Sequence, residues 1–270
     1  MENIIAFILK VYREVKEDDL FSVANNLTYK ILLALFPFVL ILMSMLSYFN
    51  IDPNYFISGL EGSLPDDIMN IATPFIIDLT QIKRPGILSV SILFLIYNAS
   101  GGFNTAMQGI NKAYGQKDSR NFFHRRLVSI ILLAFFIISI MFSLVILIFS
   151  DNIYHLVAQY FQTTAILDTI FSFVGYILTI SVLLLCVMAI NNLALARKKC
   201  FKELLPGSCF SIVCWVILSK AFNVYVNNFS RYSSLYGSVA GIMILMIWLN
   251  LICTVLLVGA EINAILSQQA

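Results

Sequence analysis

The charged residues of this chain are confined to a few short clusters, and this distribution restricts the fold more than any motif does. Long uncharged stretches separate the clusters. The stretches cover residues 31–51, 85–111, 127–150, 169–196, 204–219 and 232–260. An α-helix needs about 20 apolar residues to cross the ~30 Å hydrocarbon core of a bilayer. Only the stretch 204–219 is shorter than that, and it reaches the length if Lys220 snorkels and the helix continues to about Tyr225.

The composition agrees with lipid as the surrounding solvent. The chain has 270 residues, of which 60% are hydrophobic and 12% are charged, and its mean hydropathy is +0.88. Soluble domains carry about twice this charged fraction. We therefore predict an all-α polytopic membrane protein that forms one integral membrane domain, 1–270, with six transmembrane helices. The predicted spans cover about 31–50, 87–110, 127–150, 169–195, 204–225 and 236–262.

Lysine and arginine are distributed unequally between the two sides of this arrangement. Thirteen of the 17 lie before the first span or in the second and fourth connections. Because cytoplasmic loops of membrane proteins are enriched in these residues, we predict that both termini are cytoplasmic. The net charge of +2 does not indicate a nucleic-acid partner, and the basic clusters are expected to contact membrane lipids.

Two segments outside the spans have helical patterns. Residues 1–30 form a predicted cytoplasmic lead-in, in which apolar residues recur at the spacing of an amphipathic helix. Asp18 or Asp19 is then expected to cap a helix that runs into the first span. Residues 52–84 contain two proline-marked helix starts, so we predict a short external helical hairpin there.

Polar residues inside the predicted spans are the candidates for function, because each is costly in lipid unless it has a partner. In the second span, Asn98 lies about 16–18 Å from the outer end, near the midplane. It is followed by other polar or small residues, and the last span places Asn250 at a similar depth. The candidate midplane cavity comprises Asn98, Ser100, Gly101, Gly102, Asn104 and Asn250. Adjacent glycines can break a helix and form a transporter site; the alternative is a close helix crossing with a local hydrogen bond.

Glu261 is the acid that ends the last uncharged stretch. We predict that it lies at the cytoplasmic end of its span, at a depth similar to that of Lys30. An ion pair between the two would let both charges sit just inside the headgroups. With Asn263, they form a candidate cytoplasmic gate; simple exposure of Glu261 at the interface is the alternative.

The sequence offers little for catalysis or cofactor binding. It has five cysteines without a CxxC pair, and its two histidines, His124 and His155, are predicted on opposite sides of the membrane. A zinc site or a metal-dependent nuclease would need clustered ligands. The sequence also lacks a nucleotide-binding loop. We therefore predict no catalytic residues, no bound metal, no cofactor and no enzymatic activity.

Three segments resemble the YihY/BrkB family of bacterial inner-membrane proteins. They are DDLFSVANNLTYKILLALFPFVLILMSML, ILFLIYNASGGFNTAMQGINKAYG and the long segment from LLPGSCFSIVCW to LLVGAEINA. The resemblance implies a six-helix inner-membrane protein of a family linked to serum resistance, envelope integrity and export, some members of which carried the label ribonuclease BN. The family tends to have an aromatic residue where Lys30 stands and a serine where Ala34 stands.

Two functions remain open from the sequence. The first is a secondary transporter or exporter of a small solute, favoured by the polar midplane residues. The second is an envelope-integrity scaffold or a lipid-handling membrane protein without solute transport, favoured by the absence of an acid at the predicted midplane. An oligomer is compatible with the sequence but is not predicted by it.

Overall fold

The computed structural model describes residues 2–48, 73, 77, 85–139, 142, 165–228 and 238–268. All regular secondary structure in this part of the chain is α-helical, as predicted. The predicted external hairpin at 52–84 lies outside the described residues, except for isolated positions. The end of the third predicted span, 143–150, also lies outside them.

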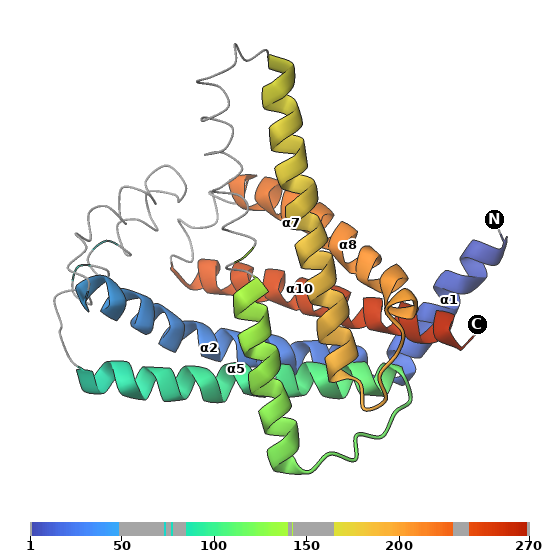
Figure 1. Cartoon of the computed structure of the whole chain (residues 1–270), viewed down its shortest axis with the longest axis horizontal. Coiled ribbons are helices and arrows are strands. Elements are labelled where there is room, and N and C mark those ends of the chain that lie inside the picture. Colours follow the sequence, from blue (N-terminus) through green and yellow to red (C-terminus); the bar gives the residue numbers. More distant parts are fainter. Residues whose placement is uncertain are drawn as a thin grey trace.

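Seven helices are described, and Figure 1 shows their arrangement. They are α1 (Glu2–Glu17), α2 (Leu20–Tyr48), α5 (Pro85–Ala113), an unlabelled helix (Phe122–Ser139), α7 (Ala165–Ala194), α8 (Phe201–Asn228) and α10 (Ser238–Ser267). The helices α2 and α5 lie side by side and run in opposite directions, and α10 packs against both. One end of the bundle contains the starts of α2 and α8, the ends of α5, α7 and α10, and the connections 114–121 and 195–200 (Figure 1). We call this region the basic end.

Five of these helices are long and apolar enough to cross a membrane. The segments are Leu20–Ile41, Phe122–Ser139, Ile177–Ala194, Phe201–Tyr225 and Gly241–Ser267. The helix α5 has 29 residues, with polar residues and glycines in its middle, and is not among these five. The predicted count of six spans therefore remains a prediction.

The start of the chain folds as its sequence pattern indicates. The predicted N-terminal amphipathic helix is α1, and α2 begins directly after Asp18 and Asp19. The Asp19 carbonyl accepts a hydrogen bond from the Val23 backbone N–H (3.3 Å), and its carboxylate accepts one from the Ser22 hydroxyl (2.7 Å). Asp19 thus starts α2, with φ of 50° at the break between the two helices.

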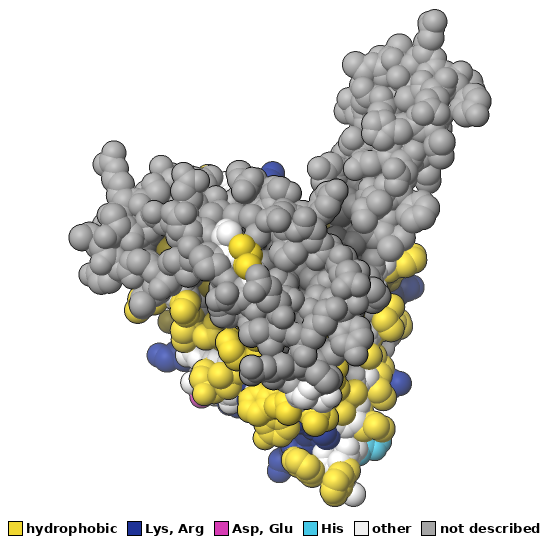
Figure 2. All heavy atoms as spheres, turned by 90° about the vertical axis from the view of Figure 1, so that its left-hand side faces the viewer, with side chains coloured by type: hydrophobic (Ala, Val, Ile, Leu, Met, Phe, Trp, Pro, Cys, Tyr) yellow, Lys and Arg dark blue, Asp and Glu magenta, His cyan; other side chains and the backbone are white. Residues whose placement is uncertain are grey.

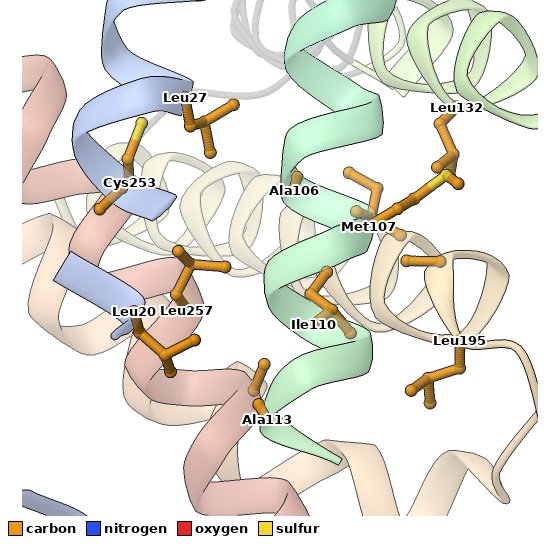
Figure 3. Close-up of a cluster of buried hydrophobic side chains, with 14 of the residues drawn as sticks. Leu20, Leu27, Ala106, Met107, Ile110, Ala113, Leu132, Leu195, Cys253 and Leu257 are labelled. Carbon is orange, nitrogen blue, oxygen red and sulfur yellow. The ribbon is translucent and has the colours of Figure 1, made fainter. Parts of the chain in front are cut away.

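Most of the buried apolar core lies toward the basic end. Figure 3 shows side chains from α2, α5, the Phe122–Ser139 helix, the start of the 195–200 connection and α10 converging there. Away from this core, large apolar side chains remain exposed on every helix that could cross a membrane. In the face that Figure 2 draws, hydrophobic side chains make up a large part of the described surface, with Lys and Arg among them. This is the surface expected of a protein whose solvent is lipid.

The helices α8 and α10 cross closely at two glycines. A Cβ atom added at Gly207 would lie 1.9 Å from the Gly259 carbonyl oxygen, and one at Gly259 would lie 2.1 Å from the Ser211 hydroxyl oxygen. Ser211 also donates a hydrogen bond across the crossing to the Val255 carbonyl (3.2 Å). Small residues are what allow helix backbones to approach this closely in a membrane.

Replacing Gly207 with alanine should destabilise the protein, because the new methyl group collides with a backbone oxygen that cannot rotate away. Overpacking of this kind costs about 1–3 kcal/mol. Thermal unfolding in detergent should show a lower midpoint, with earlier loss of the monodisperse peak in size-exclusion chromatography.

The matched control is Gly241→Ala, at an exposed α10 position with no atom within 4 Å of the added Cβ. Alanine favours a helix over glycine by about 1 kcal/mol, so this variant should be as stable as the wild type or slightly more stable. Equal stability of Gly207→Ala and the wild type would contradict the observed crossing.

Candidate functional site

The polar residues in the middle of α5 bond to their own helix. Asn98 donates to the Phe94 carbonyl (2.9 Å), Ser100 donates to the Ile96 carbonyl, and Thr105 donates to the Gly101 carbonyl (3.1 Å).

The helix continues without a break through Gly101 and Gly102. A Cβ at either glycine would make only ordinary contacts of 3.6 Å or more. The broken helix that these glycines suggested is therefore not formed. The carboxamide oxygen of Asn104 is buried without a hydrogen-bond partner among the described residues.

Two cations from other helices approach the same turn of α5. Lys30 of α2 donates to the Gly101 carbonyl (3.3 Å) and to the Thr105 hydroxyl (2.5 Å). Arg126 donates to the Tyr97 carbonyl (2.7 Å), and its guanidinium carbon lies 4.7 Å from the centroid of the Tyr97 ring. We call Lys30, Tyr97, Gly101, Thr105 and Arg126 the Gly101 cluster. From the sequence, Gly101 was a candidate for the midplane cavity and Lys30 for the cytoplasmic gate. The sequence did not indicate that the two residues are in contact.

Asn250 does not meet Asn98 in this structure. Its carboxamide donates to the Asn25 side chain (2.7 Å) and to the Thr28 hydroxyl (3.4 Å), both on α2. The depth estimates therefore disagree: Asn250 was predicted at the midplane, whereas Asn25 was predicted in the cytoplasmic lead-in. The reason is that α2 is apolar and helical from Leu20 onward, so its packed part begins well before residue 31.

Glu261 is closed inside the bundle at the basic end. Its side chain is only 2% exposed, and its Oε2 atom has no hydrogen-bond partner among the described residues. The ionisable groups that act on it electrostatically are acids, Asp18 and Glu14. The alternative of simple exposure at the interface is therefore wrong.

The Tyr114 hydroxyl lies near the same carboxylate and also has no hydrogen-bond partner among the described residues. Burial raises the pKa of the Tyr114 hydroxyl, and the negative charges of Glu203 and Glu261 raise it further. Burial likewise raises the pKa of Asp18, which lies between α1 and α2; Lys112 opposes this effect, and Glu14 adds to it. Burial and acidic neighbours thus act together on the groups in this part of the basic end.

The predicted ion pair between Lys30 and Glu261 is not formed. Lys30 is bonded to α5, about half a turn to one and a half turns beyond the residues at which Asn250 meets α2. Glu261 is eleven residues further along α10 than Asn250, about 16 Å along the helix axis. The prediction failed because it matched the ends of two spans by counting residues, whereas α2 and α10 cross with a different register.

Asn263, the third predicted gate residue, binds α8. It is fully buried; its carboxamide oxygen accepts from the Gly207 backbone N–H (2.6 Å), and its nitrogen donates to the Leu204 carbonyl (2.9 Å). These bonds lie beside the glycine crossing, so Asn263 stabilises the packing of α10 against α8. A gate role for these residues remains a prediction.

A further polar cluster, which the sequence reading missed, caps the end of α7. Asn111 donates to the Ala194 carbonyl (2.8 Å) and accepts from the Ala196 backbone N–H (2.7 Å). Arg120 donates to the carbonyls of Ala194 and Leu195, and Asp118 holds Arg120 at 3.3 Å. The last carbonyls of a helix need such donors. The charged residues that follow α5 could have indicated this cap, but they were interpreted only as evidence of the orientation of the chain in the membrane.

No group of three or more His, Cys, Asp or Glu that could hold a metal ion occurs in the described parts of the chain. All five cysteines are free. The predictions of no metal and no catalytic residues stay predictions.

The long apolar helices, the exposed apolar surface and the polar contacts inside the bundle define a multi-pass α-helical membrane protein. Comparison with known families identifies which one. The chain belongs to the Virulence factor BrkB family, whose profile matches residues 11–270. The resemblance seen in the sequence is thereby confirmed.

Similar proteins occur in several bacteria. YfkH of Bacillus subtilis (strain 168), whose name calls it ribonuclease-like, is 28% identical over 248 residues, which cover 92% of this chain and 90% of YfkH. The UPF0761 membrane protein VV0203 of Vibrio vulnificus (strain YJ016) is 24% identical over 277 residues, covering 98% of this chain and 83% of that protein. No solved structure matches the chain.

Replacing Asn111 with leucine should loosen the connection between α7 and α8. The substitution removes the buried donor and acceptor for Ala194 and Ala196, and unsatisfied buried groups cost about 1–3 kcal/mol. Limited trypsin digestion should cut the exposed Arg197 and Lys198 about tenfold faster if cleavage follows local opening.

Gln108→Leu is the control, since Gln108 is an exposed residue on the same helix. It should be cut at the wild-type rate. Mass spectrometry of the fragments identifies the sites, and equal rates for Asn111→Leu and the wild type would show that the cap contributes nothing to the order of this connection.

Proposed function

We propose that this protein is a secondary transporter or exporter of a small solute in the bacterial inner membrane, with its basic end and both termini in the cytoplasm. The observation that carries the proposal is the burial of Glu261. An ionisable residue inside a transmembrane segment is costly and commonly marks an ion or substrate pathway. Glu261 is buried, its Oε2 lacks a partner among the described residues, and acids act on it electrostatically.

The surroundings of Glu261 suit a group that gains and loses a cation or a proton during transport. A carboxylate that served only to hold the fold would be expected to have a cationic partner or several hydrogen-bond donors. Described salt bridges at the basic end involve other residues, among them Lys199 with Glu203 at 2.9 Å. The Tyr114 hydroxyl, directly after α5, is a candidate donor, because it is buried without a partner among the described residues and Glu261 acts on it electrostatically.

A second candidate function is an envelope-integrity scaffold or a lipid-handling membrane protein. The observation that favours it is that the candidate cavity residues bond within the protein: Asn98 and Ser100 bond to their own helix, and Asn250 bonds to Asn25. Side chains held in this way have a structural reason to be polar. The two functions differ in whether a solute moves.

The test compares solutes inside cells and in the medium for four strains: a deletion strain, and the same strain expressing the wild type, Glu261→Gln or Asn98→Leu. We expect at least one solute to accumulate inside the deletion strain and to return to the medium with the wild type. Glu261→Gln should abolish this export, because glutamine keeps the shape of the side chain but cannot exchange a proton.

Glu17→Gln is the matched control, since Glu17 is an exposed acid on α1. It should export at the wild-type level. Membrane amounts of every variant are measured by immunoblot, so that loss of protein is not read as loss of transport. If no solute differs between the deletion and wild-type strains while the envelope leaks, the scaffold or lipid-handling function replaces transport.

A further inference from the structure

Two positive charges converge on the turn of α5 that contains Gly101. A Cβ atom added at Gly101 would lie 3.8 Å from Arg126 Nη1 and 3.8 Å from Lys30 Cδ, so both side chains surround the same point. They come from different helices, α2 and the Phe122–Ser139 helix. Electrostatic repulsion between the two groups acts directly on Lys30. Like charges this close and partly buried are unfavourable unless an anion lies between them.

The contacts within the protein do not neutralise these charges. Lys30 bonds to a backbone carbonyl and a hydroxyl, and Arg126 bonds to a backbone carbonyl and stacks on Tyr97. Neither forms a salt bridge with a described residue. Both groups retain N–H donors that these contacts do not use. An anionic oxygen acceptor could accept hydrogen bonds from both groups.

The position of the two cations indicates which anion this is. Lys30 is the last charged residue before the uncharged stretch 31–51, and Arg126 is the last before 127–150. Two helices thus place a cation where an uncharged stretch begins, and a lysine or arginine near the end of a span can extend its side chain toward the lipid headgroups. The surface beside them is apolar and exposed, with Leu93, Phe94 and Tyr97 on α5. Acyl chains can lie along that surface, which a free inorganic anion would not use.

We infer that Lys30 and Arg126, over the Gly101 turn of α5, bind the phosphate group of an anionic phospholipid whose acyl chains lie along α5. A headgroup with net negative charge fits best, because the cation of a zwitterionic headgroup would be repelled by the second basic side chain. Tyr97 orients the guanidinium, and the Gly101 carbonyl and Thr105 hydroxyl orient the ammonium. The site does not depend on the protein being a transporter.

The test measures lipid binding to the purified full-length chain in detergent by native mass spectrometry. Phosphatidylglycerol and phosphatidylcholine with identical acyl chains are titrated separately. We expect the wild type to hold one phosphatidylglycerol more tightly than phosphatidylcholine. The double variant Lys30→Gln with Arg126→Gln should bind phosphatidylglycerol at least about tenfold more weakly, because two charge-assisted hydrogen bonds are lost.

Two controls separate charge from fold. Lys198→Gln removes an exposed lysine elsewhere at the basic end and should leave binding unchanged. Lys30→Arg with Arg126→Lys keeps both charges and should keep the preference for phosphatidylglycerol. If the glutamine variant does not fold, the salt dependence of lipid binding to the wild type is the test. Added salt should weaken phosphatidylglycerol binding but not phosphatidylcholine binding.

Three results would overturn the inference. The first is equal binding of the two lipids by the wild type, and the second is unchanged phosphatidylglycerol binding in a folded glutamine variant. The third is displacement of the lipid by inorganic phosphate at millimolar concentration with the same dependence on Lys30 and Arg126, which would identify the site as one for a soluble anion. None of these results bears on whether Glu261 supports export.

Discussion

The crossing of α8 and α10 at Gly207 and Gly259 sets the orientation of the helix on which the other contacts depend. The helix α10 packs against α1, α2, α5 and α8, so its rotation decides which side chains face each neighbour. Gly259 and Asn263 both face α8. Residues along a helix turn by about 100° each, which points Glu261, two positions from each of them, to the opposite side. It therefore faces the region of α1 and Tyr114, where its electrostatic neighbours lie.

The same rotation explains where Asn250 goes. Eleven residues correspond to about three full turns, so Asn250 lies on nearly the same face of α10 as Glu261, but about 16 Å further from the basic end. That face meets α2, where Asn25 and Thr28 accept its hydrogen bonds. Between the two levels, Leu257 fills the space beside Gly109 and Val23, where an added Cβ at Gly109 would lie 2.8 Å from Leu257 Cδ2. One face of α10 thus carries a polar contact, an apolar contact and a buried acid in succession.

The sequence predicted the fold class, α1 and the start of α2 because these depend on local patterns. Charge clustering predicts apolar helices, and Asp18 and Asp19 mark a helix boundary wherever the chain folds. The pairing of Lys30 with Glu261 could not be predicted in the same way, since it depends on the register between helices far apart in sequence. The placement of α10 against α8 depends in the same way on small residues such as Gly207 and Ser211, whose spacing of four was the available signal. The capping role of Asn111 has the same origin, because its partners are 83 and 85 residues away.

The separation of charge along the bundle has a consequence for how the two proposed sites can act. The cations of the Gly101 cluster and the carboxylate of Glu261 are held at different levels by different helices, and no described residue bonds to both groups. Sites more than about 7–10 Å apart without shared partners usually behave independently. A lipid phosphate beside Lys30 and Arg126 would therefore neutralise those cations without neutralising Glu261. The carboxyl group would remain available for exchange while Lys30 and Arg126 stay bound to the lipid. An ion pair between Lys30 and Glu261 would have tied both functions to one contact; the register of α2 and α10 keeps them apart.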